Sequence, residues 1–394
     1  GLVGSEMCIR DSHLTKWQQD KNTQYNNMAN TLKFGNGNWA TQKGSVLAYN
    51  DENNNFKPLP FDFTRDSIGT YVDSDGLIKT AGDNVPRIDY TDSSDGALLL
   101  EPARTNLLPY STLAFNGGSS PTGYSIGFQT GTFSYNQTTY KGQNAVKQTQ
   151  STAGRSYLDT GELTLSTGVT YTFRMEIDLL NTSVVAGQFI MSFSGFDTNI
   201  SKTLSDVDEF GILEFDFTFN TDAVGNIRIG LGCFGIAAGG QYMTWGMPQI
   251  EQGSYATSYI PTQGSTVTRA AETCSQTPTA GIIGQTEGTM FFETNNLFPS
   301  GTRSIALAYT SGSAYYQIYL TSTNQVRIDI NGSLLLLSSS INLTVLNKIA
   351  FAYKSGENAL YVNGVSLATS ASTAVPTSIN DFHLGNSLGN EQSG

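Results

Sequence analysis

Strict alternation of apolar and polar residues over 169–178 is the feature that most constrains the fold of this chain. One alternating set is apolar: Val169, Tyr171, Phe173, Met175 and Ile177. The other set is polar: Thr170, Thr172, Arg174, Glu176 and Asp178. The same alternation returns over 213–219 and 227–231. Because successive side chains of a strand point to opposite faces, the pattern predicts antiparallel sheets with one face on a core and the other in solvent.

The composition extends this prediction to the whole chain. Only 14% of the 394 residues are charged, whereas glycine (41 residues) and aromatic residues (11%) are plentiful. Such a mixture suits short strands joined by tight turns. We therefore predict an all-β fold: tandem antiparallel β-sandwich (jelly-roll) domains after a small, irregular β N-terminal module.

Charge and cysteine content argue against several functional classes. A net charge of −12 is not that of a nucleic-acid-binding protein. Three cysteines without a Cys-x-x-Cys or Cys/His spacing predict neither a disulfide framework nor a metal site. No apolar run approaches the length of roughly 18 residues that a membrane span needs. We expect no cofactor and no bound metal. A structural calcium ion is the alternative, and we assign it to no residue.

The sequence shows no catalytic signature either. It has only two histidines, one of which, His13, lies in the expected leader sequence, so a Ser-His-Asp or Cys-His arrangement has one credible base, and we predict no catalytic residue and no enzymatic activity. A glycosidase needs only two carboxylates, and the 33 acidic residues leave that alternative open. The DSDG turn at 73–76 lacks the spacing of an EF-hand loop, so we interpret it as an aspartate-stabilised turn.

Changes in pattern divide the chain into five segments. They are 1–27, expected to be translated adapter and leader sequence; 28–105, an N-terminal module; 106–262, a jelly-roll module; 263–274, a linker; and 275–394, a second sandwich that ends before its sheet is complete. Strands are predicted in the last segment at 287–294, 303–309, 315–320, 325–330 and 348–353. A hairpin is predicted over 359–368, with Asn363–Gly364 in a type I′ turn.

Two phrases at the segment boundaries resemble the joints of modular bacteriophage tail-fibre and tail-adhesin proteins. They are GALLLEPARTNLL at 96–108 and IEQGSYATSYIPTQGSTVTRAAE at 250–272. The stretch at 62–91 matches the same kind of joint. The segment 106–262 is similar to jelly-roll carbohydrate-binding modules, and KIAFAYKSGENALYVNGVSLAT with FHLGN resembles laminin G and concanavalin-like lectin sandwiches.

The resemblance implies an adhesive protein of the virion, assembled in the host cytoplasm. Its implied partners are a bacterial surface polysaccharide and other tail proteins, without nucleic acid or membrane. We expect a homo-oligomer, for which a trimer is one option. A secreted bacterial lectin and a glycan-depolymerising tail enzyme are the alternatives.

Sugar binding needs aromatic rings beside well-placed polar groups, and two regions offer both. In the last segment, alternation predicts that Tyr315, Gln317 and Tyr319 face outward, while Tyr316, Ile318 and Leu320 face inward. Arg327 and Asp329 are expected beside this outward stripe. A subunit contact is the alternative interpretation of the stripe.

The jelly-roll segment supplies the second set of candidates. These are Tyr242, Trp245, Arg174, Glu176 and Arg228, with Tyr255 and Tyr259 nearby. For Trp245 and Tyr259 the alternative is packing of the closing strand. For Arg174, Glu176 and Arg228 it is an ordinary solvated sheet face.

Overall fold

In a computed structural model, the regular secondary structure of the described residues is almost entirely β-strand, and the chain divides into two compact units. The structure describes residues 48–50, 56–58, 61–91, 94–130, 133–185, 187–196, 200–221, 223–277, 279, 283–294, 303–310, 314–342, 345–376 and 378–385. Unit 1 comprises 1–66, 82–102 and 271–394, and unit 2 comprises 67–81 and 103–270. The predicted segment 1–27 lies outside the described residues.

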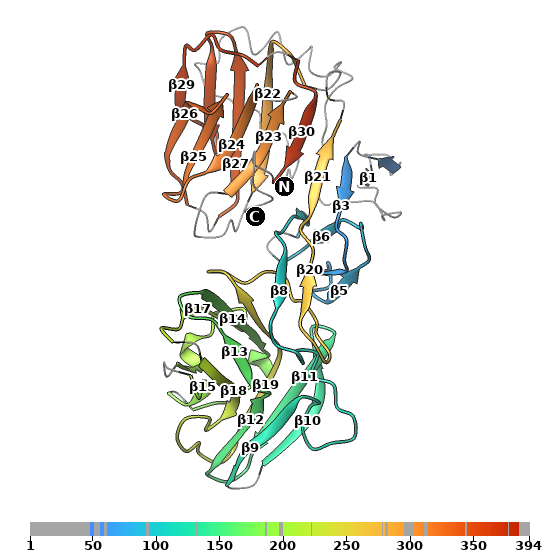
Figure 1. The fold of residues 1–394 in the computed structure, drawn as a ribbon, viewed down its shortest axis with the longest axis vertical. Coiled ribbons are helices and arrows are strands. Elements are labelled where there is room, and N and C mark those ends of the chain that lie inside the picture. The colour runs from blue at the N-terminus through green and yellow to red at the C-terminus, as the bar shows by residue number, and fades with distance from the viewer. Residues whose placement is uncertain are drawn as a thin grey trace, which may run out of the picture. The chain divides into compact units, whose positions relative to one another are not determined.

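Unit 2 is a sandwich of two antiparallel sheets (Figure 1). The five-stranded sheet runs in the order β10 (Phe133–Tyr140), β11 (Gln143–Gln150), β19 (Gln241–Gln252), β14 (Thr170–Ile177) and β17 (Ile212–Thr218). The six-stranded sheet runs β16 (Ser201–Thr203), β15 (Phe189–Ser194), β18 (Ala223–Leu231), β12 (Arg155–Thr160) and β9 (Tyr124–Thr130), with β13 (Leu163–Leu165) also paired to β18.

The core of unit 2 forms where the apolar sides of these sheets meet. Phe173 and Met175 of β14 are fully buried, as are Ile227 and Ile229 of β18. Trp245 of β19 joins them. The two-residue alternation therefore identified the core-facing side of β14 correctly.

Short elements complete unit 2. They are the hairpin of β4 (Gly69–Val72) and β5 (Ile78–Ala81), the pair of β8 (Arg104–Asn106) and β20 (Val267–Arg269), and the 3-10 turns η1 (Leu179–Asn181) and η2 (Leu204–Asp206). At the predicted DSDG turn, Asp73 Oδ1 accepts hydrogen bonds from the Asp75 and Leu77 amides, 3.0 and 2.9 Å long. That aspartate-stabilised turn is confirmed.

Unit 1 is a second antiparallel sandwich (Figure 1). Its seven-stranded sheet runs β26 (Ser333–Ser340), β25 (Gln325–Ile330), β24 (Tyr315–Leu320), β23 (Arg303–Tyr309), β30 (Asp381–Leu384), β21 (Thr273–Gln276) and β3 (Asp62–Thr64). Its four-stranded sheet runs β22 (Glu287–Thr294), β27 (Asn347–Lys354), β28 (Asn358–Val362) and β29 (Val365–Ser370). Two pairs complete the unit: β1 (Ala48–Asn50) with β2 (Phe56–Pro58), and β6 (Arg87–Asp89) with β7 (Ala97–Leu99).

The strands predicted in this unit are all present, and the core lies where alternation placed it. Tyr316 and Ile318 of β24 and Phe351 of β27 are fully buried. Asn363 and Gly364 both have positive φ, at 52° and 81°, as a type I′ turn requires. The predicted all-β fold class with tandem antiparallel sandwiches is therefore confirmed.

Residues of the segment predicted as an N-terminal module are divided between the two units. Phe63 of β3 and Ile88 of β6 lie in the core of unit 1, and β3 pairs with β21. The β4–β5 hairpin belongs instead to unit 2, where the Ile78 amide donates to the Lys141 carbonyl over 2.9 Å. The predicted linker 263–274 contains β20 and the start of β21. The described parts of both segments therefore contribute strands to the two units.

A buried charge cluster in unit 1 gives the boundary phrases a structural role. Arg65 pairs with Glu272 over 2.7 Å, and Arg87 pairs with Glu101 over 2.8 Å and with Glu272. The four side chains are at most 3% exposed. Burial would lower the pKa of Arg87, but Glu101 and Glu272 more than offset this and raise it. Each residue lies close to a point where the chain enters or leaves unit 1. Paired buried charges are costly to remove singly, so the cluster fixes these chain segments together.

Candidate ligand-binding face

The outward side of the seven-stranded sheet gathers the five residues predicted as a stripe in the last segment. Strands β24 and β25 pair so that Gln317 lies opposite Asp329 and Tyr319 opposite Arg327. Directly paired residues share a face, so these four point the same way as Tyr315. We call this surface the tyrosine face: Tyr309, Tyr315, Gln317, Tyr319, Arg327, Asp329 and His383. Strands β25, β24, β23 and β30 are consecutive neighbours in this sheet.

Asp329 organises one end of the tyrosine face. Its Oδ2 accepts a 2.9 Å hydrogen bond from the Tyr319 hydroxyl, and its Oδ1 accepts a 2.7 Å bond from Arg327 Nε. The Arg327 guanidinium lies 5.6 Å from the centre of the Tyr319 ring. Burial, together with the bond to Asp329, raises the pKa of Tyr319 to about 12, so its hydroxyl stays protonated and donates.

Asp329 lies on the outward side, as predicted, but it is only 7% exposed. The two side chains that bond to it also cover it. A carboxylate held in this way positions Tyr319 and Arg327 more than it offers itself to a ligand.

Two further aromatic rings extend the face, and the sequence did not identify them as site residues. Tyr309 of β23 pairs with Tyr315 of β24, and Leu307 pairs with His383 of β30. The rings of Tyr309 and His383 lie 5.3 Å apart. Burial lowers the pKa of His383, so its imidazole is neutral near pH 7. Tyr309 and His383 each lie on a predicted strand, but the sequence does not show that these strands are neighbours of β24 in the sheet.

The face can bind through ring stacking and hydrogen bonding. Tyr309, Tyr315 and Tyr319 are all partly exposed, and Gln317 lies among them with donor and acceptor atoms. Tyr315 and Tyr319 are four residues apart on one strand, which is about 13 Å at the usual rise of a strand. A flat surface with rings at this spacing suits an extended ligand longer than one ring.

The outward side of the five-stranded sheet in unit 2 differs from its predicted solvated state. Glu176 is only 6% exposed and accepts from Lys141 Nζ over 2.7 Å and from Arg174 over 3.2 Å. Arg174 is itself paired with Glu214 over 3.2 Å. Burial would raise the pKa of Glu176, but Arg174 and Lys141 more than offset this and lower it. Both candidates therefore belong to an ion-pair network.

Neighbouring chain covers part of this side of the sheet. Gln249 and Glu251 of β19, which point the same way as Arg174, are fully buried. Gln249 accepts from the Ile260 amide over 2.7 Å, and Glu251 accepts from the Thr257 amide over 2.6 Å. The segment after β19 therefore lies over part of this sheet and excludes solvent from Gln249 and Glu251.

Tyr242 and Trp245 occupy opposite sides of β19. Tyr242 is partly exposed, with Lys147 Nζ 5.8 Å from its ring centre. Trp245 has no exposed surface and packs against Tyr124 in the core. The structure therefore corrects the assignment of Trp245 to a ligand site and supports its alternative role in packing. The hydroxyl groups of Tyr259 and Ser111 form a 3.1 Å hydrogen bond. The Arg104 guanidinium lies 4.9 Å from the centre of the Tyr255 ring.

Arg228 lies on the six-stranded sheet, apart from the other candidates of unit 2. Its side chain is 34% exposed and pairs with Asp159 over 3.4 Å. Its guanidinium lies 5.2 Å from the centre of the Tyr157 ring. The structure thus brings together the five candidates of unit 1, but it separates the five of unit 2 among two sheet faces and the core.

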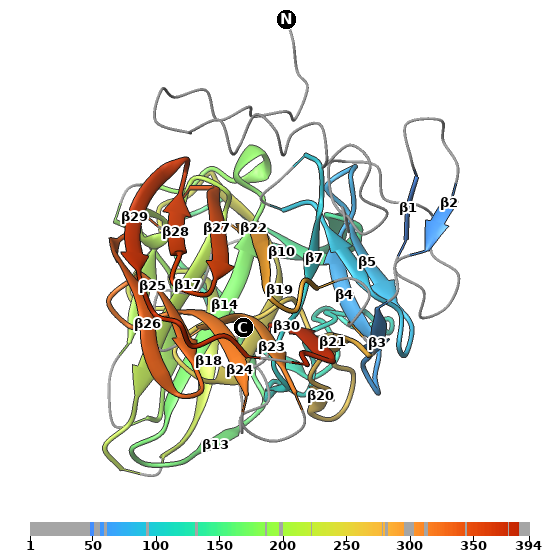
Figure 2. The same ribbon diagram turned by 90° about the horizontal axis from the view of Figure 1, so that it is seen from above.

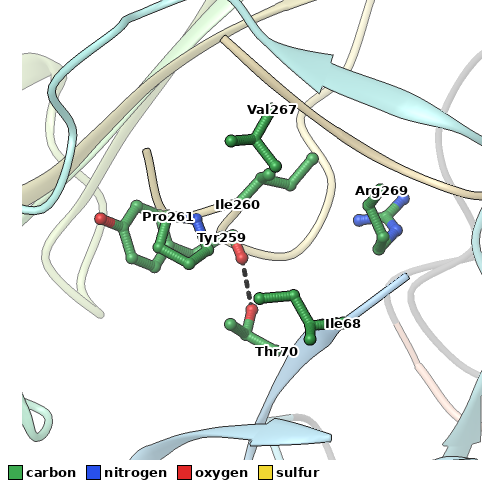
Figure 3. A pocket seen from close by; sticks show the side chains of 8 residues that line it. Ile68, Thr70, Tyr259, Ile260, Pro261, Val267 and Arg269 are labelled. Atoms are coloured by element: carbon green, nitrogen blue, oxygen red, sulfur yellow. Dashed lines mark hydrogen bonds between the residues drawn. The ribbon is translucent and has the colours of Figure 1, made fainter. Parts of the chain in front are cut away.

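A small cavity lies inside unit 2 between β4 and the 259–269 segment (Figure 3). Its lining includes Ile68, Ile260, Pro261 and Val267, and Thr70 donates to the Tyr259 carbonyl beside it. A volume of about 10 Å3 is roughly what one water molecule needs. The cavity is therefore a packing gap and not a ligand site.

Among the residues that the structure describes, no group of three or more His, Cys, Asp or Glu side chains is arranged to hold a metal ion. The described residues also contain no helix of the length and apolarity that would cross a bilayer.

Comparisons with known proteins leave the chain without a family. No protein-family model matches it, and no curated protein sequence matches it. Among solved structures, the mouse laminin alpha1 chain, domains LG4-5, aligns at 10% identity over 62% of this chain and 84% of that chain, with a TM-score of 0.22. A TM-score this low supports no inference about this chain. Its assignment as an all-β protein of two antiparallel sandwiches rests on its own strands.

Proposed function

We propose that this chain is an adhesive protein that binds an extended glycan on the tyrosine face. One observation carries the proposal: three tyrosines and a neutral histidine lie on one sheet face around Gln317 and the Tyr319–Asp329–Arg327 cluster. The C–H faces of sugar rings stack on aromatic rings, and sugar hydroxyls need fixed donors and acceptors. Asp329 supplies that rigidity because it holds Tyr319 and Arg327 in place.

The proposed biological setting is the tail of a bacteriophage, with a bacterial surface polysaccharide as the ligand. The boundary phrases at 62–91, 96–108 and 250–272 support this setting through their resemblance to tail-fibre joints. Many copies on one particle would raise weak binding at each face by avidity.

The test is binding without turnover. The full chain is incubated with surface polysaccharide extracted from candidate host bacteria, and both retained protein and newly formed reducing ends are measured. We expect the protein to be retained and the length of the polysaccharide to stay unchanged. Release of reducing ends would contradict the adhesive function and favour a depolymerase. Absence of retention on every polysaccharide and every whole cell tested would contradict glycan binding itself.

A further inference from the structure

The outward side of the four-stranded sheet in unit 1 exposes a large aromatic side chain that the tyrosine face does not explain. Phe291 of β22 is 57% exposed. It pairs with Ala350 of β27, which in turn pairs with Tyr361 of β28. Figure 2 shows β27, β28 and β29 beside one another in this sheet. Phe291 therefore lies beside a group of small side chains: Ala350, Ala352 and Ala359.

Charges are sorted by strand on this face. Acidic Glu287 and Glu293 lie on β22, and basic Lys354 and Lys348 lie opposite them on β27. Lys348 lies 3.0 Å from Glu293, and Lys354 lies 4.0 Å from Glu287. These four side chains are between 35% and 43% exposed, so they are accessible to a partner as well as to each other.

From this arrangement we infer that the face is an interface with a second copy of the chain, related by a two-fold axis parallel to the strands and between β22 and β27. We call it the Phe291 face: Glu287, Thr289, Phe291, Glu293, Lys348, Ala350, Ala352 and Lys354. The axis places β22 of each copy over β27 of the other. A two-fold interface needs a self-complementary surface, and here each strand meets the strand of opposite character.

Every pairing in this arrangement is favourable. Phe291 of each copy lies over the small Ala350 of the other. Glu287 meets Lys354, and Glu293 meets Lys348, at the two ends of the strands. The strands of both copies run in the same direction, as in aligned packing of two sheets. An aromatic anchor inside a charged rim is the usual anatomy of a protein interface.

Charge complementarity selects a second copy as the occupant. The Phe291 face has two glutamates on β22 and two lysines on β27, in two columns that match each other after a two-fold rotation. Lys354 also bonds to Glu357, in the turn after β27, over 3.1 Å. The alanine side chains of this face offer a glycan no hydrogen-bond donor or acceptor. The tyrosine face lies on the other sheet of the same sandwich, so self-association through the Phe291 face and glycan binding are separate proposals.

Charge reversal tests the inference with two full-length variants. The first carries Glu287→Lys and Glu293→Lys, and the second carries Lys348→Glu and Lys354→Glu. In each variant alone, like charges meet across the two-fold interface, so we expect dimerisation to weaken by at least about tenfold. In an equimolar mixture, the lysines of one variant meet the glutamates of the other. We expect the mixture to recover a dimer of one copy of each, measured by sedimentation velocity with one variant fluorescently labelled.

Recovery in the mixture separates the interface from a folding defect, since two misfolded variants would not restore each other. Phe291→Ala gives a second measurement, and Phe210→Ala, which removes a 68% exposed phenylalanine of unit 2, is its control. We expect Phe291→Ala to weaken the dimer and Phe210→Ala to leave it unchanged. A wild-type chain that stays monomeric at high concentration, forms trimers, or dimerises equally well in every variant would overturn the inference.

Discussion

The outward sides of β14 and β24 looked alike in the sequence but differ in the structure. Both strands alternate apolar residues with polar or aromatic ones, and the inward residues of both are buried. On β14, however, Glu176 is covered and bonded to Lys141 and Arg174. On β24, Tyr315, Gln317 and Tyr319 stay partly exposed.

The difference shows what strand alternation can and cannot predict. It identifies the side of a strand that faces the core, because successive side chains point in opposite directions. It does not show whether another segment crosses the opposite side. In unit 2 the segment after β19 lies over part of it, and it bonds to Gln249 and Glu251. A binding face therefore needs both an outward side chain and the absence of a covering segment.

The largest expected effect is a loss of stability when a core-facing side chain of β14 is removed. Phe173 is fully buried among the aromatic residues of the unit 2 core. Phe173→Ala should therefore lower the free energy of unfolding by about 3–5 kcal/mol. Chemical denaturation followed by fluorescence measures this, with exposed Phe210→Ala as the control, expected within about 0.5 kcal/mol of wild type. Equal effects for the two variants would mean that the register of β14 is wrong.

The next effect compares the loss of stability from outward side chains of β14 and β24. Glu176→Ala should cost about 1–3 kcal/mol, since it leaves Lys141 without its carboxylate and Arg174 with Glu214 alone. Gln317→Ala on β24 should stay within about 0.5 kcal/mol, because that side chain is partly exposed. Denaturation of both variants under one condition checks the contrast. A neutral Glu176→Ala variant would show that the outward side of β14 is solvated after all.

A smaller effect follows from the ionisation of Glu176. Its pKa in the folded protein lies below the ordinary value of 4.5, because Arg174 and Lys141 outweigh the effect of burial. The carboxylate therefore stabilises the fold above about pH 4.5, and this contribution is lost as the pH falls through the lowered pKa. Stability measured from pH 7 down to pH 3 should fall less steeply in Glu176→Gln than in wild type. Parallel curves for the two proteins would contradict the shift.

Much of the fold followed from local sequence, whereas the binding face followed only in part. Tyr315, Gln317 and Tyr319 were predictable as one stripe because they share a strand. Tyr309 and His383 were not, since they join the face only through the pairing of β23 with β24 and β30. Arg65, Arg87, Glu101 and Glu272 gave no sign of forming one buried cluster, because charged residues are usually placed at the surface. In each case the missing information was the contact between distant segments.

Removal of the two outer rings of β24 tests the central claim most directly. A full-length variant with Tyr315→Ala and Tyr319→Ala is compared with wild type and with Tyr71→Ala, which removes a partly exposed tyrosine of β4 in unit 2. Binding to the polysaccharide that retains the wild-type protein is measured by titration, and folding is checked by thermal unfolding. Stacking on each ring should contribute on the order of 1 kcal/mol, so the double variant should bind markedly more weakly while Tyr71→Ala binds like wild type. Undiminished binding by a folded double variant would contradict the assignment of the tyrosine face as the glycan site.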